Sequence, residues 1–201
     1  MNSCAKLVSI LSVPLWLINI FGGIVSGIWL IILGQWGIIG FGIAALFVSG
    51  IGLGIALMPG ILFSGPAAIL HEKGNKFGFY FLGFLSALYT ILVLTVWCIL
   101  VLYFFVKHAD ISSIIPVLIW SYGVAIGPIA WMAQKEMQEG NEFSMIATFF
   151  IQVAYLLSII AILFFRVSLT DVIVFFGLIM LIGLIIQFKI ASQLEKEESF
   201  Y

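Results

Sequence analysis

The side chains able to carry acid–base chemistry lie at the edges of long apolar stretches. The nine carboxylates fall between these stretches or in the C-terminal tail, at Glu72, Asp110, Glu136, Glu139, Glu142, Asp171, Glu195, Glu197 and Glu198. Ionisable groups inside apolar segments are typical of proton relays, ion-coupled sites and voltage sensors. The placement of the acidic residues therefore argues against each of these activities.

The histidines and cysteines show no spacing typical of a metal site or of nucleophilic catalysis. His71 and His108 are expected on opposite faces of a membrane, and Cys4 and Cys98 are expected to be free thiols. The chain contains no His-Glu-x-x-His pair, no Gly-x-Ser-x-Gly turn and no phosphate-binding loop ending in Lys-Ser/Thr. We predict no catalytic residue, no metal and no cofactor.

Neutral polar residues within the apolar stretches are the remaining candidates for a site. Ser144, Thr148, Gln152 and Tyr155 recur at helical spacing, so they would line one face of a helix. Such side chains form hydrogen bonds between helices in a membrane interior, or they line a cavity or narrow pore. The sequence leaves both interpretations open. The residues of the polar stripe or pore would be Ser86, Thr148, Gln152 and Tyr155.

The elements that position these residues are predicted to be membrane helices. The chain is 64% apolar and 8% charged, with a mean hydropathy of +1.28, whereas about 25% of residues are charged in soluble proteins. We predict an all-α polytopic membrane protein with about six transmembrane helices. Its single transmembrane domain would cover 1–190, followed by a short charged cytoplasmic tail, 191–201. Because a span needs about 20 apolar residues, the spans would be about 8–33, 36–58, 77–106, 113–134, 143–165 and 171–190.

The distribution of basic residues predicts the orientation. With six spans, one side holds only Lys107 and Arg166, and the other holds Lys6, Lys73, Lys76, Lys135, Lys189 and Lys196. Because basic residues accumulate in cytoplasmic loops, both termini are expected in the cytoplasm. Residues 59–70 are too apolar for a loop and too short for a span. We predict a re-entrant or interfacial turn there, broken at Pro59 and Pro66.

An internal repeat relates two hairpins of the sequence. The Gly-Asn pairs at 74–75 and 140–141 are each followed by Phe, Phe and Tyr at a constant offset of 66 residues. Ser86 then corresponds to Gln152, and Tyr89 to Tyr155. Both halves would cross the membrane in the same direction, unlike the inverted repeats of many secondary transporters. The alternative is two separate hairpins with similar turns, since Gly and Asn both tolerate positive φ.

Glycines are concentrated between residues 22 and 65. Gly23 and Gly27 are one helical turn apart, and so are Gly50 and Gly54. Small residues at this spacing allow two helix backbones to approach closely in lipid. These glycines are predicted to pack helices within one chain or to join subunits of a homo-oligomer.

The first two spans also contain a pattern of glycine, tryptophan and proline. It is carried by "FGGIVSGIWLIILGQW" and "GIALMPG", with Gly22, Gly23, Trp29, Gly34, Trp36 and Pro59 at the matching positions. With this pattern, residues 20–60 resemble the YccF type of small bacterial inner-membrane proteins. The resemblance implies a bacterial inner membrane, and it implies no activity.

Two functions are compatible with these features. The first is a non-catalytic membrane subunit, a scaffold, anchor or sensor, that oligomerises and communicates with a soluble cytoplasmic protein. The second is a small channel or carrier for a neutral solute or ion. A net charge of −1 gives no basic surface for nucleic acid, so lipid and protein are the expected partners. The predicted partner surface contains Lys135, Glu139, Leu194, Phe200 and Tyr201.

Overall fold

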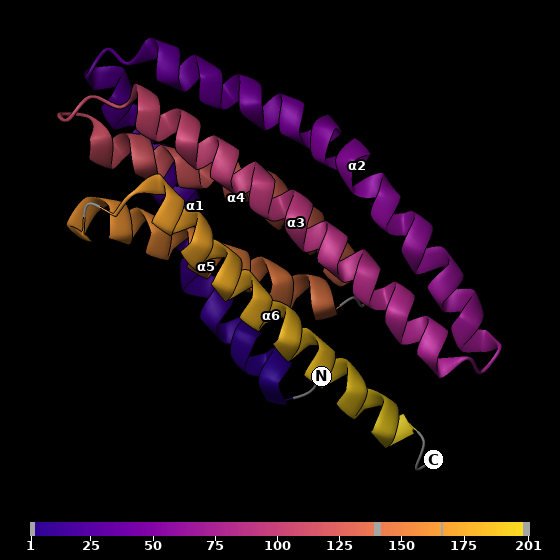
Figure 1. Ribbon diagram of the computed structural model, residues 1–201. Helices are drawn as coiled ribbons and strands as arrows, with labels where there is room; N and C mark the ends of the chain where they lie inside the picture. Colours follow the sequence, from indigo (N-terminus) through magenta and orange to yellow (C-terminus); the bar gives the residue numbers. More distant parts are fainter. Residues whose placement is uncertain (1–2, 139–141, 166, 199–201) are drawn as a thin grey trace.

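The computed structural model is an antiparallel bundle of long helices (Figure 1). It describes the backbone of all residues except 1–2, 139–141, 166 and 199–201, and the side chains except those of 1–9, 61, 134–145, 166, 169 and 187–201. Within the described backbone the helices are α1 Ser3–Ile32, α2 Trp36–Glu72, α3 Lys76–His108, α4 Ile114–Gln138, α5 Glu142–Phe165 and α6 Leu169–Glu198.

The predicted all-α polytopic membrane fold is confirmed. Among the described residues, five helical segments are long and apolar enough to cross a membrane: Ile10–Ile32, Trp36–Gly60, Lys76–His108, Ile114–Ala133 and Ile146–Phe165. A shorter apolar segment, Thr170–Ile186, lies in α6. Helices dominate because lipid offers no hydrogen bonds, so the backbone of each segment must satisfy its own polar groups.

The direction of the chain alternates from one helix to the next (Figure 1). The α1–α2 and α3–α4 connections lie at one end of the bundle. The α2–α3 turn lies toward the other end, as do the start of α1 and the end of α6. The predicted tail is partly helical, because α6 continues through it as far as Glu198.

The predicted break within residues 59–70 is wrong. The helix α2 continues through Pro59 and Pro66 to Glu72. Pro59 has no N–H for the carbonyl of Ile55, but a break would expose still more backbone groups to an apolar environment. Instead, α3 donates hydrogen bonds to carbonyls beside this position. Ser86 Oγ donates to Gly60 O, and Tyr89 OH donates to Ala56 O, both at 2.9 Å.

Two short turns connect the first three helices through glycines of positive φ. Gly34 and Gly74 both have φ 71°. After each, the next amide donates to a carbonyl five residues earlier, from Gln35 N to Leu30 O and from Asn75 N to Leu70 O, both at 2.9 Å. This is the Schellman arrangement, which favours glycine because a Cβ is strained at this φ. Of the two residues predicted to tolerate positive φ, only Gly74 adopts it.

Asn75 instead caps the start of α3. Its φ is −84°, and its side chain accepts a hydrogen bond from Gly78 N at 3.0 Å. An asparagine side chain in this place satisfies one of the free amides in the first turn of a helix. The second Gly-Asn pair, at 140–141, lies outside the described residues.

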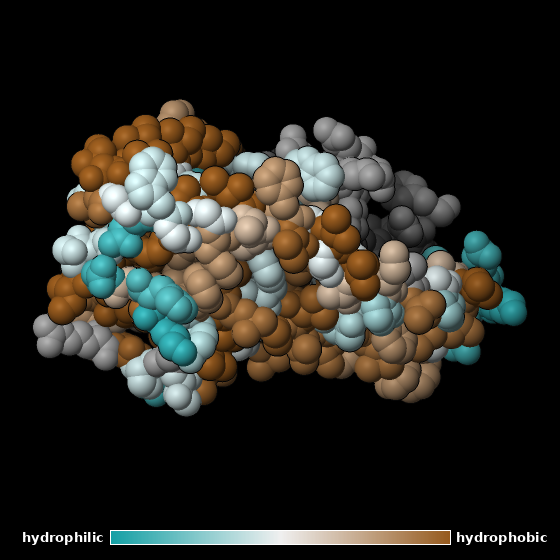
Figure 2. Space-filling model, turned by 90° about the horizontal axis from the view of Figure 1, so that it is seen from above, coloured by the Kyte–Doolittle hydropathy of each residue, from teal (hydrophilic) through white to brown (hydrophobic). Residues whose placement is uncertain are grey.

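The helix α4 lies at the centre of the bundle. It packs against α1, α2, α3 and α5, and its buried residues include Val117, Leu118, Ala125 and Ile126. The outer surfaces of α1 and α2 remain strongly apolar, with many exposed Ile, Leu, Val and Phe side chains. Figure 2 shows apolar residues over the middle of the molecule and hydrophilic residues toward its two ends. This distribution is typical of a protein surrounded by lipid.

Candidate functional site: a buried polar cluster

Four neutral polar side chains meet between α4 and α5. We call them the polar cluster: Ser121 and Tyr122 from α4, and Gln152 and Tyr155 from α5. Each is at most 1% exposed. Tyr122 OH donates to Gln152 Oε1 at 3.2 Å, and Tyr155 OH donates to Ser121 Oγ at 3.1 Å. Ser121 Oγ in turn donates to Leu118 O at 2.7 Å.

The first helix also contacts this cluster. Tyr122 OH lies 3.4 Å from Leu15 O, and Asn19 Nδ2 lies 3.5 Å from Tyr122 O. The rings of Tyr122 and Tyr155 are tilted against each other, with their centroids 5.9 Å apart. The polar cluster therefore joins three helices that are distant in the sequence, and its hydroxyl and amide groups make hydrogen bonds among these helices.

The predicted stripe residues lie at two separate interfaces. Gln152 and Tyr155 belong to the polar cluster, and Thr148, on the same helix, is buried as well. Ser86 lies between α2 and α3, where it donates to Gly60. The side chain of Ser144 is outside the described residues.

The proposed repeat has a counterpart in these contacts. Ser86 and Tyr89 of α3 bond to the preceding helix, α2, near its proline. Gln152 and Tyr155, at the matching positions of α5, bond to the preceding helix, α4. Corresponding residues thus hold corresponding pairs of helices together.

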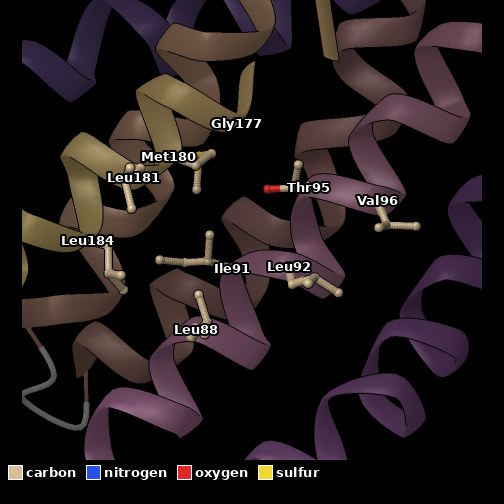
Figure 3. A pocket seen from close by; sticks show the side chains of 9 residues that line it. All are labelled: Leu88, Ile91, Leu92, Thr95, Val96, Gly177, Met180, Leu181 and Leu184. Carbon is tan, nitrogen blue, oxygen red and sulfur yellow. The ribbon is translucent and has the colours of Figure 1, made fainter. Parts of the chain in front are cut away.

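A cavity of about 220 Å³ lies elsewhere, between α3 and α6 (Figure 3). Its lining is apolar except for Thr95, whose Oγ1 has no hydrogen-bond partner and points toward Met180. None of the stripe residues lines this cavity. Its chemistry suits an apolar chain or ring. The lining residues are Leu88, Ile91, Leu92, Thr95, Val96, Gly177, Met180, Leu181 and Leu184.

The predicted glycines divide into a packed set and an open set. On α1, a Cβ at Gly27 would lie 3.0 Å from Trp120 Cζ3, whereas a Cβ at Gly23 would meet no atom within 4 Å, although Gly23 Cα lies 3.7 Å from the Cβ position of Gly123. Gly27 thus packs against α4 within the chain, and Gly23 has open space beside its Cβ position. On α2, a Cβ at Gly50 or Gly54 would meet no atom within 4 Å.

Trp120 fills the notch between α1 and α2, which sequence analysis did not identify. A Cβ at Gly42 would overlap Trp120 Nε1 and would lie 2.9 Å from Cε2 of the same ring. The indole Nε1 is buried without a hydrogen-bond partner. The residues Trp120, Ser121 and Tyr122 are consecutive, so they do not share one helical face. The only sign of this contact in the sequence was that these three residues stand together within an otherwise apolar segment.

The four members of the polar cluster include no carboxylate, imidazole or thiol. Among the described residues, no three His, Cys, Asp or Glu side chains are grouped as a metal site requires. Cys98 is a free, buried thiol. The predicted partner residues Lys135, Glu139, Leu194, Phe200 and Tyr201 lie outside the residues whose side chains are described.

Comparison with known proteins gives no relative. No protein-family model matches the chain, and neither a curated protein nor a solved structure matches it significantly.

Proposed function

We propose that this integral membrane protein is a non-catalytic subunit that self-associates and serves as a scaffold, anchor or sensor for a soluble cytoplasmic protein. A bacterial inner membrane, with both termini in the cytoplasm, is part of this proposal. The location is supported by the resemblance of residues 20–60 to the YccF type, and the orientation by the basic residues at 73 and 76.

The observation that carries self-association is the open glycine face of α2. Gly50 and Gly54 have free space beside them, and bulky side chains stand next to them on the outer surface. Phe47 is 77% exposed and Ile51 is 71% exposed. Glycines flanked by large apolar residues provide a groove into which a second helix packs closely in lipid. Gly27 on α1 is already packed against Trp120 of α4, and we therefore assign the surface for a second copy to α2.

The polar cluster supports a structural role for the stripe. Membrane hydrogen bonds between helices contribute about 0.6 kcal/mol each on average. Those at Tyr122–Gln152 and Tyr155–Ser121 join buried groups within the chain. A bundle held together in this way suits a subunit that presents surfaces to partners.

Replacing both Gly50 and Gly54 by leucine is expected to abolish self-association. The added side chains would fill the groove and keep a second helix at a distance. Native mass spectrometry of the purified protein in lipid nanodiscs would measure the loss. The matched control is Gly177→Leu on α6, which is also an exposed glycine with no atom within 4 Å of its Cβ position.

Three results would overturn the proposal. The first is a wild-type protein that is monomeric, and the second is an oligomer that survives both leucines. The third is selective, saturable flux of a neutral solute or ion by the purified protein in proteoliposomes. Such flux would establish the channel or carrier instead.

Removing residues 195–201 is expected to weaken binding of the cytoplasmic partner without changing insertion or oligomeric state. Aromatic side chains bordered by polar residues are favoured binding anchors, so Phe200→Ala combined with Tyr201→Ala should reproduce most of the loss. Glu197→Gln combined with Glu198→Gln is the control, because it changes charge and keeps both aromatics. Quantitative proximity labelling in cells would compare the variants. Equal labelling by all of them would exclude the tail as the partner surface.

A further inference from the structure

The hairpin of α2 and α3 is longer than a membrane is thick. The 37 residues of α2 and the 33 residues of α3 correspond to about 55 Å and 50 Å at 1.5 Å per residue. The hydrocarbon core of a bilayer is about 30 Å thick. By comparison, α4 and α5 have 25 and 24 residues and are about 38 Å and 36 Å long. The end of the hairpin therefore extends past the level at which α4 leaves the apolar region.

The extended end of the hairpin differs in composition from the ends of α4 and α6, which lie at the same end of the bundle. After its apolar segment α4 continues into "QKEMQ", and α6 continues into "KIASQLEKEE". Both continuations carry the charges expected of helices in water. The hairpin tip, which we define as residues 62–70 of α2 and 77–84 of α3, contains no charged residue. The charged residues nearest to it lie in the turn, at Glu72, Lys73 and Lys76.

The apolar side chains of the hairpin tip point outward. Leu62 is 74% exposed, Phe77 is 81% exposed and Phe81 is 53% exposed. Phe77 and Phe81, one turn apart on α3, stack with their ring centroids 6.2 Å apart. Exposed aromatic and aliphatic side chains next to lysines are the composition of segments that lie at a membrane surface. Water would be an unfavourable environment for this surface.

From these observations, we propose that the hairpin tip is embedded in the lipid leaflet on the side of the two termini. Its phenylalanines enter the region between headgroups and acyl chains, and Lys73 and Lys76 contact the phosphates of anionic phospholipids. The two helices of the tip stay packed together, because α3 donates hydrogen bonds to α2 next to it. These bonds run from Ser86 to Gly60 and from Tyr89 to Ala56. The tip therefore enters the lipid as a hairpin, by tilting or by thickening the bilayer around it. This interaction is independent of self-association at Gly50 and Gly54.

Depth measurements with nitroxide labels test the proposal. Single cysteines would replace Leu62 or Phe81 in the full-length protein carrying Cys4→Ala and Cys98→Ala, reconstituted in liposomes of phosphatidylcholine and phosphatidylglycerol. Oxygen concentrates in hydrocarbon, whereas a nickel chelate stays in water. Leu92, which lies in mid-helix and is 57% exposed, is the lipid reference, and Ile111, in the α3–α4 connection and 96% exposed, is the water reference.

Labels at Leu62 and Phe81 are expected to show the high ratio of oxygen to nickel accessibility found at Leu92. Ratios as low as that at Ile111 would place the tip in water and overturn the proposal. Low accessibility to both reagents would mean that protein covers the tip, which would equally overturn it.

The contribution of the lysines has its own test. Lys73→Glu combined with Lys76→Glu should lower the oxygen-to-nickel ratio at Phe81 in liposomes containing phosphatidylglycerol and leave it unchanged in pure phosphatidylcholine. The same ratio in both lipids, before and after the substitutions, would remove the anionic headgroups from the proposal. The variant with Lys73→Glu and Lys76→Glu is expected to keep the oligomeric state of the wild type. A failure of the lipid proposal can therefore be distinguished from a failure of self-association.

Discussion

Gly42→Ala is expected to destabilise the bundle more than alanine at any other glycine of α2. The new Cβ would overlap Trp120 Nε1 and would lie 3.1 Å from Val124 Cγ2. The ring has little room to retreat, because Gly27 of α1 is close to its opposite edge, with 3.0 Å between the Cβ position and Cζ3. Overpacking of this kind costs about 1–3 kcal/mol. Alanine's higher helix propensity returns at most about 1 kcal/mol.

The free energy of unfolding in micelles or bicelles, measured by steric trapping, would show this loss. Gly40→Ala is the matched control on the same helix, because no atom lies within 4 Å of its Cβ position. In addition, Trp120→Phe should partly rescue Gly42→Ala, since the smaller ring leaves the space that the methyl group needs. Equal stability of the two alanine variants would contradict the assignment of Trp120 as the wedge between α1 and α2.

Tyr155→Ala is expected to lower the free energy of unfolding by about 3–5 kcal/mol, more than Gly42→Ala does. It removes a fully buried ring and leaves a cavity beside Tyr122 and Ser121. Tyr155→Phe keeps the ring and removes only the hydroxyl that donates to Ser121. Its expected cost is therefore near the average of about 0.6 kcal/mol for an interhelical hydrogen bond in a membrane protein.

The same unfolding measurement compares these two variants. The expected order is wild type, then Tyr155→Phe slightly below it, then Tyr155→Ala far below both. A phenylalanine variant as unstable as the alanine variant would show that the hydrogen bonds of the polar cluster, and not its packing, dominate its contribution to stability.

Sequence patterns predicted the helices and their connections because the forces involved are local. An apolar stretch of about 20 residues must become a helix in lipid, whatever its neighbours. The turn at Gly74 followed from glycine's access to positive φ, and the helix cap at Asn75 has the same local origin. The helical spacing of Gln152 and Tyr155 also placed both on one face of α5, as the structure has them.

The error at residues 59–70 has a non-local cause. Proline removes one backbone hydrogen bond from a helix, but in a membrane protein neighbouring helices can supply other donors to the backbone around it. The donors here are Ser86 and Tyr89, which are 26 and 33 residues away from their acceptors. Neither donor is near Pro59 in the sequence, so the residues around this proline do not reveal them.

What the sequence by itself determined is therefore the set of helices, the connections at Gly34 and Gly74, and the polar residues that each helix carries, since these depend on contacts within a few residues. Only the tertiary structure decided how those residues are used. It paired Gln152 with Tyr122, placed Trp120 between Gly27 of α1 and Gly42 of α2, and left Gly50 and Gly54 open on α2. The physical reason is that glycine, serine and tyrosine are equally suited to several neighbours in an apolar medium, and the choice among them depends on which helices the whole chain brings into contact.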